Sequence, residues 1–219
     1  MNILVLSCDK DTDIFEAFHH CIEKYWPEHP EIIYATETVK NPYYKTISKN
    51  YPLNKWTRRI RETLAEIDEK KLLVMVDDYF IRKPVDLERI KYAEEHLRGN
   101  IAHLNFEKAY DPNDVLTALD GFKMRQHGSM YEVSMMCGIW DRDKFIKVLD
   151  RDCDPWTIEL EQQNKGFDYY INSGDYIIDG GYVTFKHFAL KKGKWCREII
   201  PFFEKEGITM DYSKRGFAD

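Results

Sequence analysis

The chain has 219 residues and five cysteines, and its formal net charge at pH 7 is -6. A chain of this length buries roughly 70% of its unfolded surface, so it needs neither disulfides nor a structural metal in order to fold. The acidic balance argues against a general nucleic-acid binder, because binding along a phosphate backbone requires a basic face.

The cysteines are odd in number, widely spaced and never form a C-x-x-C pair. This pattern argues against a disulfide framework and against a structural zinc site. Residues 1–6 are too short a run and lack the basic flank of a signal peptide, and no segment is long enough to cross a bilayer. We therefore expect a cytoplasmic protein, held at the inner face of the membrane if its substrate is anchored there.

The first half of the chain alternates apolar strands with amphipathic helices. The apolar runs predict strands at 3–7, 32–36, 72–76 and 101–106. Apolar residues at helical spacing predict helices over 15–25, 56–67 and 87–97, between those strands. This order predicts a parallel sheet with right-handed crossovers, and hence an α/β fold with helices on the faces of the sheet.

The second half is more mixed. We expect a strand over 131–140, then a helix capped by Asp141, and a short helix that follows Asp154 and Pro155. Short apolar runs at 176–178 and 182–185 flank Gly180-Gly181 and predict a hairpin. A basic stretch and a C-terminal helix follow. No linker rich in Ser, Gly or Pro divides the chain, so a single domain over residues 1–219 is expected.

Two adjacent carboxylates, Asp77 and Asp78, directly follow the most apolar strand, 72–76. Five consecutive apolar residues are typical of a strand buried on both faces. Like charges at its end repel each other and lose hydration, and a divalent cation bridging them to phosphate oxygens would relieve that cost. The alternative is that the pair merely begins a solvated loop.

The expected carboxyl ends of three strands carry polar residues. Ser7 and Asp9 follow the first strand, Thr36 ends the second, and Asp77 follows the third. Ligands of open α/β sheets bind outside the carboxyl ends of the strands, so these residues are expected to converge on one site.

Several stretches together resemble bacterial glycosyltransferases that build capsular and cell-surface polysaccharides. The stretches are Ser7-Cys8-Asp9-Lys10 with Tyr25-Trp26-Pro27, Trp56-Thr57-Arg58-Arg59-Ile60, Asp77-Asp78-Tyr79-Phe80-Ile81, Gly138-Ile139-Trp140-Asp141-Arg142 and Asp154-Pro155-Trp156-Thr157-Ile158-Glu159. The resemblance covers most of the chain up to about Glu159. It implies the GT-A fold, with a nucleotide-binding half in 1–110 and an acceptor and catalytic half in 111–219.

The resemblance also implies a nucleotide-sugar donor, a UDP-sugar by family habit, and a divalent metal, Mn²⁺ or Mg²⁺. In such a fold Asp78 would bind the metal, Asp77 the ribose or the metal, and His187 would be a third metal ligand. The family's strict D-x-D spacing is absent, because the two acids are adjacent. This departure leaves open which of them is the ligand and whether metal is required.

Residues for the rest of the donor can be proposed from their chemistry. Ser7, Asp9 and Thr36 would hydrogen-bond the base and ribose, although acids in the 9–13 stretch could instead cap the next helix. Lys10 and Arg59 would contact the phosphates, and Lys192 in the basic stretch would stabilise the leaving diphosphate. The alternatives are a solvated helix face for Arg59 and an exposed basic hairpin for Lys192.

Glu159 is the candidate catalytic residue. It lies three residues after Trp156, so an aromatic wall and a carboxylate are expected to share one helix face. A general base must reach the acceptor hydroxyl, and in inverting enzymes of similar pattern an acid after a Trp does so. The alternatives are that Glu159 is an ordinary surface residue, or that Asp154 acts instead.

The sequence therefore favours a metal-assisted, inverting glycosyltransferase with a glycan or lipid-linked glycan as acceptor. One alternative is a sugar nucleotidyltransferase, which would require a glycine-rich loop after the first strand, where this chain has Ser7 to Asp11. The other is a non-catalytic partner domain that binds nucleotide sugars.

Overall fold

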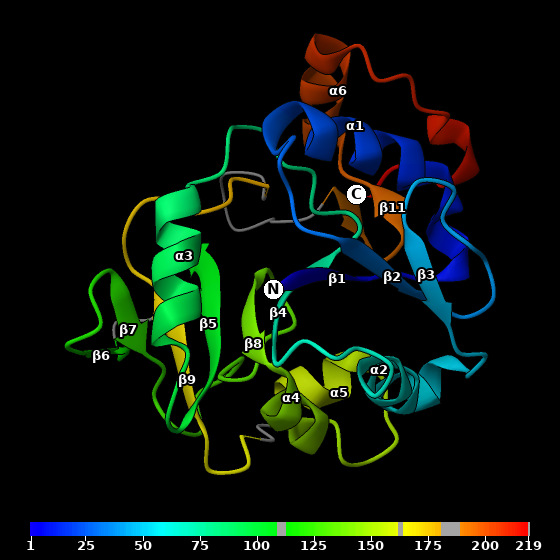
Figure 1. The fold of residues 1–219 in the computed structure, drawn as a ribbon. Helices are drawn as coiled ribbons and strands as arrows, with labels where there is room; N and C mark the ends of the chain where they lie inside the picture. The colour runs from blue at the N-terminus through cyan, green and yellow to red at the C-terminus, as the bar shows by residue number, and fades with distance from the viewer. Residues whose placement is uncertain (109–112, 162–163, 181–188, 219) are drawn as a thin grey trace.

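The computed structural model describes residues 1–108, 113–161, 164–180 and 189–218. Within these ranges, nine strands form one sheet in the order β3-β2-β1-β4-β8-β5-β9-β7-β6 (Figure 1). The strands are β1 (Asn2–Leu6), β2 (Ile32–Thr36), β3 (Lys45–Ser48), β4 (Lys71–Val76), β5 (Ile101–Lys108), β6 (Val115–Leu116), β7 (Phe122–Met124), β8 (Gly138–Asp141) and β9 (Asp168–Asn172). A separate hairpin joins β10 (Leu190–Lys191) to β11 (Lys194–Trp195).

Helices cover both faces of the sheet (Figure 1). Those of the described residues are α1 (Phe15–Tyr25), α2 (Trp56–Leu64), α3 (Leu87–His96), α4 (Arg142–Val148), α5 (Pro155–Leu160) and α6 (Ile200–Glu206). Short 3₁₀ helices are η1 (Asp9–Ile14), η2 (Leu53–Lys55), η3 (Arg197–Ile199) and η4 (Tyr212–Lys214). No helix among them combines the length and the apolar surface that crossing a membrane requires.

The core has two layers, one on each face of the sheet. In β1, Ile3 and Val5 pack with α1, α3 and α6, whereas Leu4 and Leu6 pack with α2, α4 and α5. Because alternate residues of a strand point to opposite faces, both faces need apolar residues, and the strand becomes an unbroken apolar run. The predicted α/β fold, a mostly parallel sheet between helices with a mixed second half, is confirmed.

β1 is parallel to both of its neighbours, β2 and β4. The exception at the centre is β8, which lies antiparallel between β4 and β5. Gly138 permits this close insertion, since a Cβ there would lie 2.5 Å from the backbone oxygen of Leu104. The sequence pattern did not predict this inverted strand.

The strand predicted over 131–140 is correct only at its end, from Gly138. Tyr131 has φ +57°, and the buried Glu132 carboxylate accepts the backbone N–H of Gly128, so a turn replaces the first part. The strand predicted at 176–178 is wrong. Its carbonyl groups bond to 79–86 instead: Asp86 N donates to the Ile177 oxygen and Tyr79 Oη to the Ile178 oxygen. The partner run at 182–185 lies outside the described residues.

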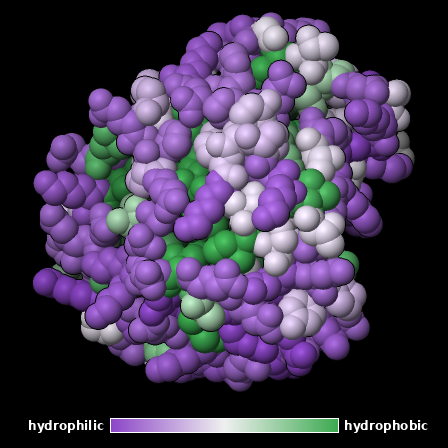
Figure 2. Space-filling model, turned by 45° about the vertical axis from the view of Figure 1, so that its right-hand side comes forward, coloured by the Kyte–Doolittle hydropathy of each residue, from purple (hydrophilic) through white to green (hydrophobic). Residues whose placement is uncertain are grey.

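Strand β3 arises within the polar stretch 41–52, which the sequence pattern predicts as a loop, and β9 lies where no element is predicted. The predicted cap is confirmed, because Asp141 accepts the backbone N–H of Lys144. The C-terminal helix is confirmed as α6, with Phe203 buried. Figure 2 shows the side on which β2 and β3 lie: hydrophilic side chains cover most of it, and apolar ones gather in a band across the middle.

Candidate functional site

The carboxyl ends of β1 and β4 bring Ser7 and Asp77 together, as the sequence predicted for neighbouring parallel strands. Leu6 and Val76 are paired at the ends of these strands, and the next residues continue side by side. The Ser7 hydroxyl donates a hydrogen bond of 2.6 Å to Asp77 Oδ2. Thr36 ends β2 on the other side of β1. The site is therefore a sheet edge at which three strand ends meet.

The acid pair is held in an unfavourable electrostatic setting. Asp77 is only 5% exposed, and Asp78 is partly buried. Burial raises the pKa of the Asp77 carboxyl well above its usual range, and the charges of Asp11 and Asp78 add to this effect. Burial and Asp11 raise the pKa of Asp78 to about 7. The backbone N–H of Leu190 lies 3.4 Å from Asp78 Oδ2 and gives a weak bond.

A third carboxylate reaches the pair from η1. Asp11 Oδ2 accepts a hydrogen bond of 2.8 Å from the Cys8 thiol. Asp11 Oδ1 lies 2.9 Å from a guanidinium nitrogen of Arg215, near the other end of the chain. Three acids of like charge thus gather where β1 and β4 end, and one arginine lies beside them.

Arg59 fastens the ends of β1 and β2 to α2. Its side chain is only 2% exposed. Nη2 donates to the carbonyl oxygen of Ser7 at 2.8 Å, and Nη1 pairs with Glu37 Oε1. The other oxygen of Glu37 accepts the backbone N–H of Asp9 at 2.6 Å. Glu37 thereby balances the buried charge, and the guanidinium holds the loops that border the site.

Asp9 and Thr36 stabilise the loop after β2. The Asp9 carboxylate accepts hydrogen bonds from the backbone N–H groups of Thr38 and Val39, at 2.9 and 3.0 Å, and from the Thr38 hydroxyl at 2.5 Å. Burial opposes the shift, but these hydrogen bonds outweigh it and lower the pKa of Asp9. Thr36 is buried, and its hydroxyl donates to the Val39 oxygen at 2.6 Å. Asp9 and Thr36, both predicted to bind the nucleotide-sugar donor, thus lie at the edge of the site, and their polar atoms form hydrogen bonds within this loop.

Two of the predicted basic residues, Lys10 and Lys192, are exposed, whereas Arg59 is buried in its pair with Glu37. Lys10 is exposed on η1, and its carbonyl oxygen accepts a hydrogen bond from Arg215. Lys192 is exposed in the turn between β10 and β11, with φ +53°. His187 lies outside the described residues.

Glu159 fixes the segment that leads into β8. Its carboxylate accepts the backbone N–H of Met135 at 2.7 Å. Burial raises the pKa of Glu159, against the opposing effect of hydrogen bonds from Met135 and Ser134. Met135 packs in the same core layer as Val76, the residue before Asp77. Trp156, expected to share a face with Glu159, is 60% exposed.

The acids can contribute two ligands to a hard cation. Among the described residues, no group of three or more His, Cys, Asp or Glu side chains is placed to hold a metal ion. Mg²⁺ and similar ions commonly bind through one or two carboxylates together with substrate phosphates and water. Asp77 and Asp78 fit this mode, in which the protein supplies only part of the coordination.

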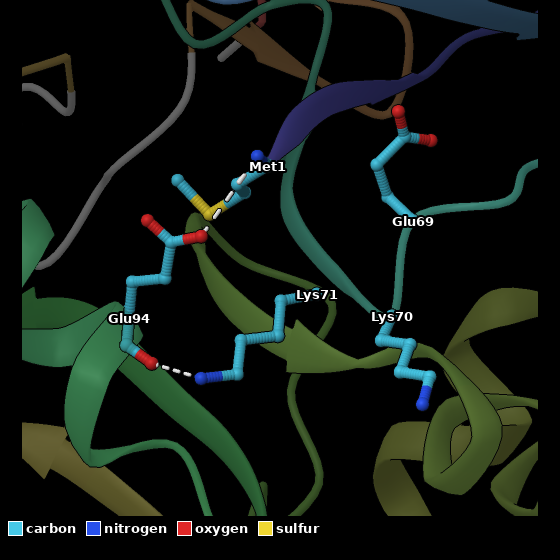
Figure 3. Close-up of a pocket in the computed structure, with 5 residues that line it drawn as sticks. All are labelled: Met1, Glu69, Lys70, Lys71 and Glu94. Carbon is cyan, nitrogen blue, oxygen red and sulfur yellow. Dashed lines mark hydrogen bonds and ion pairs between the residues drawn. The ribbon is translucent and has the colours of Figure 1, made fainter.

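A hollow of about 280 Å³ lies at the opposite edge of the sheet, before β1 and β4 (Figure 3). It is lined by Met1, Glu69, Lys70, Lys71 and Glu94. Lys71 Nζ donates to the carbonyl oxygen of Glu94, and the amino group of Met1 lies 3.8 Å from the Glu94 carboxylate. The hollow lies at the far edge of the sheet from Asp77 and Asp78, so it adds nothing to the acid site.

Sequence reasoning missed Arg215 and the pairing of Glu37 with Arg59, and it did not place Asp11 with the acid pair. Asp11 stands two residues after Asp9 in an acidic stretch, which was a usable signal. Nothing in the sequence marks Arg215, whose partner Asp13 is 202 positions away.

No family model and no curated protein matches the sequence. Solved structures with a similar chain path include the bifunctional IspDF from Campylobacter jejuni, at 12% identity and TM-score 0.41, with 79% of this chain and 50% of that chain covered. They also include the CMP:2-keto-3-deoxy-manno-octonic acid synthetase complexed with CTP, at 11% identity and TM-score 0.48, with 79% and 89% covered. An active-site mutant of LgtC matches at 15% identity and TM-score 0.43, with 76% and 65% covered.

The chain thus spans half the length of the bifunctional IspDF. At these identities and TM-scores, the similarities assign no function to the chain.

Proposed function

We propose that this protein is a nucleotide-sugar-dependent glycosyltransferase that moves a sugar from a nucleoside diphosphate donor to a glycan or lipid-linked glycan. The first candidate donor is a UDP-sugar, and the proposed setting is surface polysaccharide biosynthesis. The observation that supports the proposal is the group of acids formed by Asp11, Asp77 and Asp78 at the carboxyl edge of the sheet. The repulsion and lost hydration of such a group destabilise the folded protein unless the binding of a ligand offsets them.

A cation together with a pyrophosphate would do so. Both carboxylates could bind one divalent ion, and phosphate oxygens would complete its coordination. Mn²⁺ or Mg²⁺ would then supply positive charge to the leaving diphosphate when it is bound. Exposed Lys10 and Lys192 are the proposed further contacts for the phosphates, and His187 a further ligand. Ser7 lies next to Asp77 and is the proposed contact for the ribose.

In the proposed inverting reaction, an acceptor hydroxyl attacks the anomeric carbon. The new carbon–oxygen bond forms as the bond from that carbon to the β-phosphate oxygen breaks, and the nucleoside diphosphate leaves with that electron pair. The hydroxyl proton passes to Glu159, whose raised pKa suits a general base. The bond from Met135 fixes one oxygen of this carboxylate.

The loop after β1 favours glycosyl transfer over nucleotidyl transfer. A nucleotidyltransferase would require a glycine-rich loop, whose backbone approaches a triphosphate closely. Here residues 7–14 contain no glycine, and η1 occupies this position, with the charge of Asp11 acting on both Asp77 and Asp78. The two reactions also release different products, a nucleoside diphosphate and pyrophosphate.

Calorimetry and thermal shift with UDP, GDP and CDP, each with and without Mn²⁺, test the proposal. We expect one diphosphate to bind and to raise Tm, more strongly with Mn²⁺, and D77N and D78N to abolish that binding. D143N is the matched control, because Asp143 is an exposed acid on α4. Binding by both site variants at wild-type affinity would overturn the proposal. Release of pyrophosphate from a nucleoside triphosphate and a sugar phosphate would favour the alternative reaction.

A further inference from the structure

We propose that the C-terminal segment, residues 211–218, forms part of the ligand site, and that Arg215 is the positioning residue that holds η1 against the acid pair. This inference rests on the proposed nucleotide site and names the element that shapes it. Figure 1 shows the C-terminal segment in red beside the blue segment that contains η1 and α1.

Arg215 contacts three positions of η1. Nε donates to Asp13 Oδ2 at 2.8 Å, and Nη2 makes a second bond to the same carboxylate. Nη2 also donates to the carbonyl oxygen of Lys10 at 2.9 Å and pairs with Asp11 at 2.9 Å. Its side chain is 9% exposed, so these bonds are sheltered from water. A bidentate arginine–carboxylate contact fixes the relative orientation of the two groups as well as the distance between them.

The segment that carries Arg215 is itself bound to β11. The backbone N–H of Trp195 donates to the Gly216 oxygen at 3.0 Å, and that of Ala218 donates to the Trp195 oxygen at 2.9 Å. The ring of Trp195 is fully buried, and the Arg215 guanidinium lies 5.9 Å from its centre. Arg215 is therefore held on a paired backbone and a buried aromatic ring.

The same hairpin contacts the acid pair from its other strand. Leu190, in β10, directs its backbone N–H to Asp78, and Leu190 pairs with Trp195 across the hairpin. The contacts therefore close a ring. It runs from Asp78 through β10, β11 and the C-terminal segment to Arg215 and Asp11. It returns through the Cys8 thiol, which bonds to Asp11, and the neighbouring Ser7, which bonds to Asp77. These contacts place Arg215 between Asp11 and Asp13, which would otherwise repel each other.

Removing Arg215 would leave Asp11 and Asp13 without their shared cation. A carboxylate that loses its partner in a sheltered place carries an uncompensated charge. We therefore expect Asp11 to move outward into water. The Asp11 side chain would then no longer stand beside Asp77 and Asp78. We expect R215A to weaken the affinity for UDP with Mn²⁺ at least tenfold. R215K should restore it in part, since lysine keeps the charge but cannot make the bidentate contact.

K24A is the matched control. Lys24 pairs with Glu206 at 2.6 Å and so joins α1 to α6, another contact between the two ends of the chain. If Arg215 only docks the C-terminal part, both substitutions should lower Tm and affect ligand binding alike. If Arg215 positions η1, only R215A should change the affinity.

A second measurement needs no ligand. The Cys8 thiol donates to Asp11 and is partly exposed, so release of η1 should make it react faster. We expect iodoacetamide to alkylate Cys8 several times faster in R215A than in wild type or K24A, by peptide mass spectrometry. Cys153, also partly exposed, serves as the internal reference, since it lies on the opposite helix layer.

The inference is overturned if wild type binds UDP with Mn²⁺ and R215A and R215K bind it equally well. It is also overturned if R215A and K24A lose affinity to the same extent. If wild type binds no nucleoside diphosphate, the proposed function fails, and the alkylation rates decide the role of Arg215. A Cys8 rate in R215A no faster than in K24A then contradicts it.

Discussion

Asp78 carries its charge in a place where the folded protein favours the neutral form. Its pKa of about 7 is above the usual value of 3.8, so the folded state binds a proton more tightly than the unfolded state. The resulting loss of stability is absent below about pH 3.8, grows as the pH rises, and is complete above about pH 7. Sites that trade stability for ligand binding show this behaviour.

We therefore expect D78N to raise the stability of the ligand-free protein, by on the order of 1 kcal/mol or more at pH 8, since one pKa unit corresponds to about 1.4 kcal/mol. The gain should shrink at pH 5. Urea unfolding of wild type and D78N at both pH values measures it, and D143N should show no such gain. A D78N protein less stable than wild type at pH 8 would contradict the view that the pair is electrostatically costly.

Glu159 combines a proposed chemical role with a visible structural one. E159Q keeps an acceptor for the Met135 N–H but cannot accept a proton from the acceptor hydroxyl. We expect turnover to fall about 10²-fold or more while donor affinity changes little. E161Q is the control, because Glu161 is exposed and pairs with Arg151. Loss of donor binding in E159Q would instead assign Glu159 to holding the segment before β8.

Among the elements, the inverted strand β8 depends on one residue without a side chain. A Cβ at Gly138 would meet His103 Nε2 at 2.4 Å as well as the backbone of Leu104. Backbone cannot move away as a flexible side chain can, so β8 would have to shift. We expect G138A to destabilise the protein by about 1–3 kcal/mol, the usual range for overpacking.

Gly174 provides the control for that substitution. A Cβ there would lie 3.5 Å from the nearest atom of Asn172, an ordinary contact. G174A should change Tm little, whereas G138A should lower it by several degrees in the same thermal unfolding experiment. Equal Tm values for the two variants would mean that the strand tolerates a methyl group.

The sequence predicted those elements whose signal is local. The apolar runs of β1, β2 and β4 and the Asp141 cap depend on residues close together in the chain. From the strand ends it also followed that Ser7 and Asp77 would meet. The local signal of the interior strand β8 predicted a strand but not its reversed direction, because that direction depends on a contact between Gly138 and β5. The ion pair between Arg59 and Glu37 inside the fold could not be predicted from the sequence either.

At the scale of the whole molecule, one buried histidine makes the stability of the fold depend on pH. His103 in β5 is 1% exposed and stacks on Trp140, with ring centres 4.3 Å apart. Burial lowers its pKa from 6.5 to about 3, so the folded protein keeps the ring neutral. The contribution to stability is complete above pH 6.5 and is lost as the pH falls from 6.5 toward 3.

H103F keeps a ring for the stack but removes the titrating group. Between pH 6 and pH 4, the free energy of unfolding should therefore fall less steeply for H103F than for wild type, by up to about 1.4 kcal/mol per pH unit. Chemical unfolding at half-unit pH steps gives both slopes. Parallel curves would show that His103 binds its proton equally well in the folded and unfolded states.

The ring of contacts through Arg215 joins the first loop after β1 to residues near the other end of the chain. Its partners are separated by about two hundred positions, and no spacing rule reaches so far. The strands that form this sheet edge can thus be predicted from local sequence patterns, whereas the contacts of Arg215 around it cannot.

The reversed direction of β8 has one more consequence. Because β8 runs against β4, the residues that precede it, including Ser134 and Met135, arrive at the same edge as the residues that follow β4. The acids follow β4, whereas Ser134 and Met135 precede β8. The two sides of this edge therefore come from separate stretches of the chain. Substitutions in residues 129–136 should then change the surroundings of Asp77 and Asp78 while leaving the strand that leads into them intact.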